Sequence, residues 1–175
     1  MTTDLRFPVG RFTYERPYSA EEREELIRQI EKAPGELRAA YQALPPGGLD
    51  TPYRPGGWTA RQVIHHVPES HMNSYLRFKF AMTEQEPTIK PYDEAVWAVQ
   101  PDVASTPPEV SLDLLDALHR RWVAFLRTLK EDDWKRTFRH PQMGVVTLDR
   151  TLGLYAWHGR HHVAHLRQIG APRTT

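Results

Sequence analysis

The feature that most constrains the fold is the recurrence of apolar residues at three- and four-residue spacing in four long stretches. The stretches cover residues 19–44, 59–83, 106–129 and 147–170. Strand signals are nearly absent, apart from a short extended stretch at residues 144–148. Amphipathic helices bury their apolar faces against one another. We therefore predict an all-α four-helix bundle in which residues 1–175 form a single domain.

Local signals place the ends of these helices. Residues 19 and 22, and residues 59 and 62, have capping-box spacing and begin the first two helices. We expect the third helix to begin at Thr106, with Pro107 in its first turn, and the fourth to run from near Thr147 to Gly170. Pro34, followed by Gly35, predicts a kink or a break in the first helix, and Pro68 predicts a bend just after His66 in the second.

Two segments outside the helices carry structural information. Residues 1–18 hold four aromatic side chains, which favours an ordered arm lying on the core. Residues 83–105 form a long connection in which residues 92–99 are expected to form a short helix. A connection of this length in a compact domain is typical of a functional loop or a lid.

Composition excludes several classes of protein. Lys and Arg total 23 against 22 Asp and Glu, and the charges are mixed along the chain, so no basic stripe predicts nucleic-acid binding. There is no cysteine, hence no disulfide, thiolate ligand or cysteine nucleophile. Neither a signal-peptide pattern nor an apolar stretch of membrane-spanning length occurs. We expect a cytoplasmic protein that does not bind membranes.

Nine histidines are a high number for this length. The last predicted helix carries four histidines within eight residues, and the second carries His65, His66 and His71. His119 and His140 are isolated in the sequence, and we assign His140 to a surface turn. Several imidazoles on an apolar stripe are unfavourable unless each nitrogen has a partner. Coordination of a metal ion would give these nitrogens a partner, and hydrogen bonding among core histidines is the alternative.

Within the last helix, His158 and His162 lie four residues apart and project from the same face, which suits chelation of one ion. Gly159 follows His158, so the motif is not the HExxH of metalloproteases. On the second helix the periodicity leaves both His66 and His71 open as a third ligand.

Three blocks of sequence resemble a known family. LDTPYRPGGWTARQVIHHVPESHMNSYLRFK, KPYDEAVW and YAWHGRHHVAH look like the DinB/YfiT-like superfamily, especially the YfiT-type branch that includes bacillithiol transferases. The resemblance covers nearly the whole chain and implies an antiparallel bundle and a homodimer. It also implies metal ligands at His66, His158 and His162.

Other residues are then candidates for contacts around the ion or the substrate. His161 and His165 are expected to support the ligands or line a pocket, because a metal-bound imidazole donates its second N–H to a partner. Asn73, Tyr155, Arg160 and Ser70 are further candidates.

Three neutral imidazoles leave an open position on a divalent ion, which is typical of catalytic sites. We expect one zinc or nickel ion per chain. The resemblance implies transfer of a small thiol of the bacillithiol type to an electrophilic substrate. The alternatives are hydrolysis by metal-bound hydroxide, and a stress-response binding protein with a structural metal. No catalytic residue is assigned; Asp149 and Glu69 are weak candidates for a general base.

Overall fold

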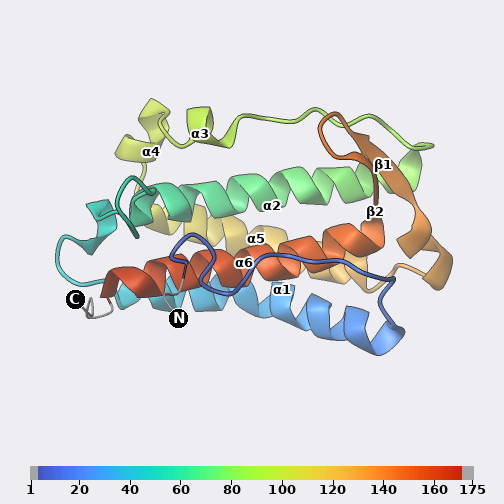
Figure 1. Cartoon of the computed structure of the whole chain (residues 1–175), viewed down its shortest axis with the longest axis horizontal. Helices are drawn as coiled ribbons and strands as arrows, with labels where there is room; N and C mark the ends of the chain where they lie inside the picture. The colour runs from blue at the N-terminus through green and yellow to red at the C-terminus, as the bar shows by residue number, and fades with distance from the viewer. Residues whose placement is uncertain (1–3, 171–175) are drawn as a thin grey trace.

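The computed structural model describes residues 4–170 and confirms the four-helix bundle (Figure 1). The long helices are α1 (Ala20–Gln42), α2 (Ala60–Thr83), α5 (Pro108–Leu126) and α6 (Leu148–Gly170). Helix α1 packs against α5 and α6, and α2 packs against the same two helices. In the part of the chain described, no helix is long and apolar enough to cross a membrane.

The connections explain the directions of the helices. A short connection with a 3-10 turn, η1 (Gly48–Asp50), makes α1 and α2 antiparallel. The long connection over residues 84–107 contains α3 (Glu94–Trp97) and α4 (Pro101–Ser105), and it returns the chain to the end where α2 began (Figure 1). As a result α2 and α5 run in the same direction, and α6 runs antiparallel to both.

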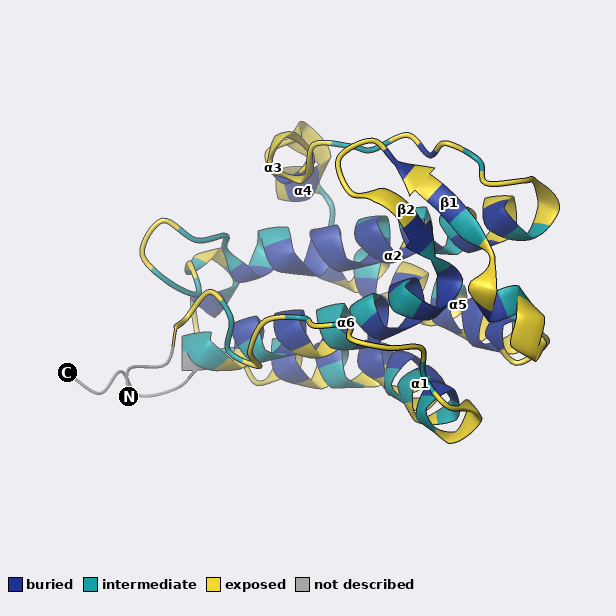
Figure 2. Ribbon diagram, turned by 45° about the vertical axis from the view of Figure 1, so that its right-hand side comes forward, coloured by how far each residue is buried: buried dark blue, intermediate teal, exposed yellow. Residues whose placement is uncertain are grey.

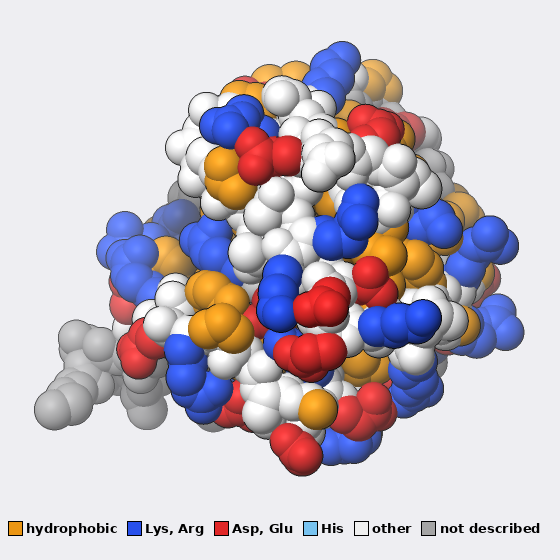
Figure 3. All heavy atoms as spheres, turned by 90° about the vertical axis from the view of Figure 1, so that its right-hand side faces the viewer, with side chains coloured by type: hydrophobic (Ala, Val, Ile, Leu, Met, Phe, Trp, Pro, Cys, Tyr) orange, Lys and Arg blue, Asp and Glu red, His pale blue; other side chains and the backbone are white. Residues whose placement is uncertain are grey.

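Between α5 and α6 lie a 3-10 turn, η2 (Glu131–Lys135), and an antiparallel hairpin. Its strands are β1 (Thr137–His140) and β2 (Gly144–Thr147), and Phe138 lies opposite Val146 in the register. Both of these side chains are buried. The extended stretch expected near residue 144 is therefore one strand of a hairpin that covers an end of the bundle. On that end of the molecule, Lys and Arg side chains lie among Asp and Glu side chains (Figure 3).

The capping boxes predicted at Ser19 and Thr59 are present. Helix α5 begins at Pro108, two positions after the predicted start at Thr106, because Pro107 is the capping residue. The break expected near Pro34 does not occur, since α1 continues through it as α2 continues through Pro68. Pro34 is buried, and tertiary packing overrides its local cost.

The interior has an apolar cluster towards each end of the bundle. One cluster contains Ile30, Phe78, Trp122 and Leu152, and the other contains residues of the opposite helix halves, among them Leu37, Ile64, Leu115 and Leu166. On each of α2, α5 and α6, buried or partly buried histidines lie where the residues of one cluster give way to those of the other. We call these histidines (His66, His71, His119, His158 and His162) the histidine layer.

Figure 2 shows the buried residues on the inward faces of the long helices, whereas α3 and α4 are mostly exposed. At the histidine layer α1 and α6 approach closely at Gly159, where a Cβ atom would lie 3.1 Å from the Cβ of Ala33. The glycine that follows His158 is therefore explained by helix packing.

The arm is ordered over residues 4–18, as expected; residues 1–3 lie outside the described part. Asp149, at the start of α6, accepts hydrogen bonds from the Tyr14 hydroxyl at 2.8 Å and from the backbone N–H of Tyr18 at 2.9 Å. Further along α6, the Trp157 indole N–H donates to the carbonyl of Gly10 at 3.0 Å. These contacts hold the arm along α6 (Figure 1).

Candidate metal centre

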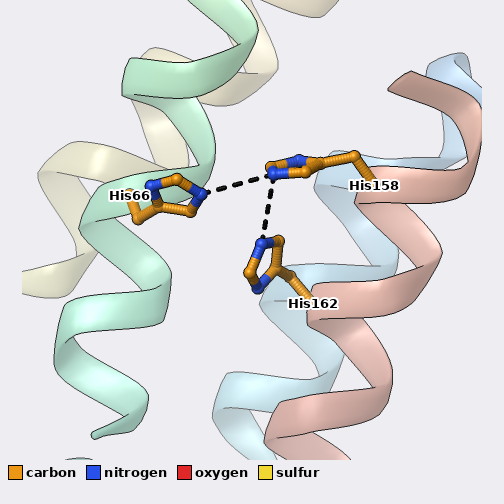
Figure 4. Close-up of side chains that lie close together, drawn as sticks. All are labelled: His66, His158 and His162. Atoms are coloured by element: carbon orange, nitrogen blue, oxygen red, sulfur yellow. Dashed lines mark hydrogen bonds between the residues drawn. The ribbon is translucent and has the colours of Figure 1, made fainter. Parts of the chain in front are cut away.

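Three imidazoles of the histidine layer converge on one point (Figure 4). His66 extends from α2, and His158 and His162 extend from successive turns of α6. The Nε2 atom of His158 lies 3.3 Å from Nε2 of His66 and 3.2 Å from Nε2 of His162. One nitrogen from each ring lies within 4.8 Å of the other two. We call these residues the three-histidine cluster.

The spacing of these nitrogens fits a metal ion. A tetrahedral zinc ion binds imidazole nitrogen at about 2.0–2.1 Å, which places two ligand nitrogens about 3.3 Å apart. Two of the three separations match this value. The donor set also fits, because imidazole nitrogen suits zinc and nickel, and no thiolate or carboxylate belongs to the cluster.

Burial keeps the three rings neutral, as metal ligation requires. Burial lowers the pKa of His66 to about 4. The pKa values of His158 and His162 lie well below the ordinary value, first because both rings are buried and second because neighbouring histidines would repel a positive charge. At neutral pH each ring therefore offers a lone pair.

A cavity of about 370 Å³ opens onto the cluster. Its walls come from the loop before α2, from α2 itself, from α3 and from α6. The lining residues are Tyr53, Arg54, Gly56, Gly57, Trp58, His66, Glu94, Trp157, His158, His161, His162 and His165. The cavity has the size of a small-molecule site, with aromatic walls and a few polar groups.

Glu94 is the one carboxylate in that lining, and sequence reasoning missed it. The residue begins α3, whose N-terminus is capped by Asp93 through hydrogen bonds at 3.0 and 3.1 Å from two backbone N–H groups. Glu94 is exposed to solvent as a residue, and partial burial of its carboxyl raises its pKa. A carboxyl with a raised pKa in the wall of such a cavity is suited to proton transfer.

Two of the predicted supporting residues line the cavity. The ring of His165 stacks on Tyr53 at a centroid distance of 3.8 Å. Its Nε2 atom donates to the carbonyl of Arg6 at 3.3 Å, and its Nδ1 atom lies 3.4 Å from Nδ1 of His162. His161 stacks on Trp157 at 4.3 Å, and burial lowers its pKa to about 4.

The other candidates lie differently. Tyr155 is buried, with its hydroxyl 3.4 Å from the Ser70 hydroxyl and its ring against His71. Asn73 and Arg160 do not line the cavity, because each bonds a carbonyl of its own helix, at 2.9 and 3.4 Å.

Three further assignments change. Neither Asp149 nor Glu69 lines the cavity, and Asp149 is occupied by a buried ion pair with Arg23. His140, expected in a surface turn, is buried at the end of β1, where its Nδ1 atom accepts from the backbone N–H of Gln142 at 3.2 Å. Of the two histidines left open on α2, His66 belongs to the cluster, whereas His71 lies behind His158.

Together, the fold and the site define a helical-bundle protein with a candidate three-histidine centre for one divalent ion. The sequence profile of the DinB superfamily matches residues 29–166, and the chain belongs to this superfamily. Proteins of Bacillus cereus strain B4264, Bacillus thuringiensis subsp. konkukian strain 97-27 and Bacillus anthracis strain CDC 684 are each 54% identical over 166 residues, 95% of both chains. All three carry the name "Putative metal-dependent hydrolase".

Solved structures show the same fold. YfiT from Bacillus subtilis, described as "a probable metal-dependent hydrolase with an unusual four-helix bundle topology", is 45% identical, with a TM-score of 0.91 and 95% of each chain covered. The mycothiol-dependent maleylpyruvate isomerase is 18% identical, with a TM-score of 0.64 over 85% of this chain and 61% of that one. The second likeness concerns the fold alone.

Proposed function

We propose that the protein is an enzyme that holds one divalent metal ion through Nε2 of His66, His158 and His162 and transfers a small thiol to an electrophilic substrate. The observation that carries the proposal is the convergence of three neutral imidazoles at the wall of a small-molecule cavity. Structural zinc sites are usually closed by four protein ligands, whereas three leave a position for a reactant. Among the described residues, the three-histidine cluster offers three nitrogen ligands.

When bound, the ion supplies a Lewis acid that lowers the pKa of a coordinated thiol or water molecule. The residues of the chain position the reactants and shape the surroundings of the ion. His158 and His162 fix the position of the reacting centre from one helix, and His66 closes it from another. The rings of Trp58 and Trp157 exclude water from the wall, and the guanidinium of Arg54 attracts anionic groups of a substrate.

Thiol transfer needs a nucleophile from outside the chain, because the sequence contains no cysteine. The sulfur forms a bond to an electrophilic carbon as the bond from that carbon to its leaving group breaks. The thiol proton passes to the Glu94 carboxylate and then to the leaving group. The maleylpyruvate isomerase of the same fold is named as mycothiol-dependent, so this fold is compatible with a thiol cosubstrate.

Hydrolysis is the second candidate, and two observations favour it. The Bacillus relatives are named as metal-dependent hydrolases, and Glu94 gives the cavity a carboxylate that could accept a proton from water. In this case water adds to the carbonyl carbon of an ester or amide, and the leaving group departs with the proton that Glu94 accepted.

The test begins with the metal content of the purified, untagged protein beside His66→Ala. We expect about one zinc or nickel ion per chain in the wild type and loss of the ion in the variant. The loaded protein is then assayed with bacillithiol and an alkylating electrophile, and separately with activated esters. Metal-dependent consumption of thiol supports transfer. Ester cleavage without thiol consumption supports hydrolysis, and a metal-free wild type refutes the metal site.

A further inference from the structure

A backbone carbonyl on α1 lacks its usual partner within the helix. In an α-helix the N–H of residue 34 would bond the carbonyl of residue 30, but Pro34 has no N–H. The carbonyl of Ile30 is instead 2.6 Å from Nδ1 of His119, on α5. A carbonyl oxygen only accepts hydrogen bonds, so Nδ1 of His119 carries the proton. A neutral imidazole carries one proton, and Nε2 of His119 is then an acceptor.

The direction of that first bond sets the next one. Nε2 of His119 lies 2.8 Å from Nδ1 of His71, and the two rings are stacked. Since Nε2 of His119 accepts, Nδ1 of His71 donates, and Nε2 of His71 becomes an acceptor in its turn. His71 is fully buried, with Trp122 and Tyr155 packed edge-on against its ring at 5.9 and 5.1 Å. A positive charge in this enclosure is unfavourable, and one proton per ring is the state that burial favours.

The chain of bonds ends on a residue of the three-histidine cluster. Nε2 of His71 lies 3.0 Å from Nδ1 of His158. Because Nε2 of His71 accepts, Nδ1 of His158 must donate. The proton of His158 is thus on the side away from the cluster, and its Nε2 lone pair points towards His66 and His162 (Figure 4).

We propose that His119 and His71 are positioning residues that fix His158 as the Nδ1–H tautomer and hold its Nε2 atom at the metal centre. This proposal rests on the metal site proposed above. The carbonyl of Ile30 gives the relay its direction, because a bond in the opposite sense would require the carbonyl to donate. Partners of this kind orient a ligand ring and raise its basicity.

The first experiment is ¹⁵N NMR of histidine-labelled wild-type protein without metal. We expect Nδ1 of His158, His71 and His119 to show the signature of protonated nitrogen, and Nε2 of the same rings that of unprotonated nitrogen. A His158 ring protonated at Nε2 overturns the proposal, without any variant and without any assay of activity.

The second experiment measures the dissociation constant for zinc in His119→Leu by competition with a chelator. We expect the constant to rise about 10- to 100-fold, the usual effect of removing a residue that orients a ligand. His119→Gln, whose amide can both accept from His71 and donate to Ile30, should bind zinc more tightly than His119→Leu. If His119→Leu does not fold, His119→Gln and the wild type are compared by the ¹⁵N NMR measurement described above. A His158 ring protonated at Nε2 in both proteins overturns the proposed chain of hydrogen bonds from Ile30 to His158.

His65→Leu is the matched control. His65 is buried on α2 and bonds the Ser111 hydroxyl of α5 at 2.7 Å, so it links the same two helices without touching the relay. We expect this variant to lose stability but keep the zinc affinity of the wild type. An equal loss of affinity in His65→Leu and His119→Leu would show a merely structural effect and overturn the proposal. A wild type that binds no zinc refutes the proposed function instead.

Discussion

Replacing His158 by alanine tests the centre most directly, because this ring contacts both other members of the three-histidine cluster. Without metal, the variant leaves Nε2 of His71 without its partner at 3.0 Å. An unsatisfied buried group costs about 1–3 kcal/mol, against a total stability of about 5–15 kcal/mol for a typical domain. We therefore expect the variant to fold, with the helical circular dichroism of the wild type.

The variant should also lose most of the stability that a bound ion supplies. An ion at 100 times its dissociation constant stabilises a folded protein by about 2.7 kcal/mol. If loss of one of three ligands raises that constant about 100-fold, the same ion concentration stabilises the variant by only about 0.4 kcal/mol. For a chain of this size, the wild type should gain about 5–10 °C in Tm on adding zinc, and His158→Ala about 1–2 °C.

The assay is thermal unfolding of metal-free protein titrated with zinc, read by circular dichroism. His140→Ala is the control, because His140 is also buried but lies in the hairpin, where its imidazole accepts one backbone hydrogen bond. The control should melt slightly earlier and keep the full zinc-dependent gain. An undiminished gain in His158→Ala would refute the assignment of this residue as a ligand.

Three further predictions concern pH, the cavity and the arm. Burial lowers the pKa of His66, His119, His161 and His165 from 6.5 to about 4, so between these values the unfolded chain binds more protons than the folded one. Urea unfolding of metal-free protein should therefore show the full free energy of unfolding above pH 6.5 and a lower one as the pH falls towards 4. The loss should be about 1.4 kcal/mol per pH unit for each proton taken up on unfolding. Equal stability at pH 7 and pH 5 would contradict this prediction. Glu94→Gln should keep the metal and lower the turnover about 10²- to 10⁴-fold, the usual contribution of a general acid or base, and an unchanged rate would remove Glu94 from the mechanism. Asp149→Asn breaks the buried pair with Arg23 and should cost about 3–5 kcal/mol in urea unfolding with no change in zinc affinity, whereas a lower affinity would show that the arm acts on the site.

The sequence contained enough information for the helices and for the two members of the three-histidine cluster on α6. Capping-box spacing placed the starts of α1 and α2 correctly, and the four-residue spacing of His158 and His162 put both rings on one face of one helix. Helical periodicity is a local property and can be read from one stretch at a time. His66 could not be separated from His71 in this way, and the resemblance to a known family was needed for that choice.

Residues whose role depends on other elements could not be found from local pattern. His119 looks isolated in the sequence because its partners lie on α1 and α2, 89 and 48 positions away. Glu94 lies in a connection whose course over the cavity is set by the crossover between α2 and α5. The same limit explains the unbroken α1, because the cost of Pro34 is local, whereas the packing that tolerates it comes from the rest of the bundle.

The three rings of the cluster are not supported equally, and this asymmetry follows from the helices that carry them. His158 is backed by His71, and His162 by His165, whose Nε2 donates to the Arg6 carbonyl. Within the described residues, Nδ1 of His66 is buried without a hydrogen-bond partner, and the ring packs edge-on against Trp58 at a centroid distance of 4.8 Å. Helix α6 thus presents two pre-oriented lone pairs, while α2 contributes a ring whose Nδ1 atom no hydrogen bond orients. We therefore expect metal affinity at the proposed site to respond to the spacing of α2 and α6, because only their approach brings the third nitrogen to the other two.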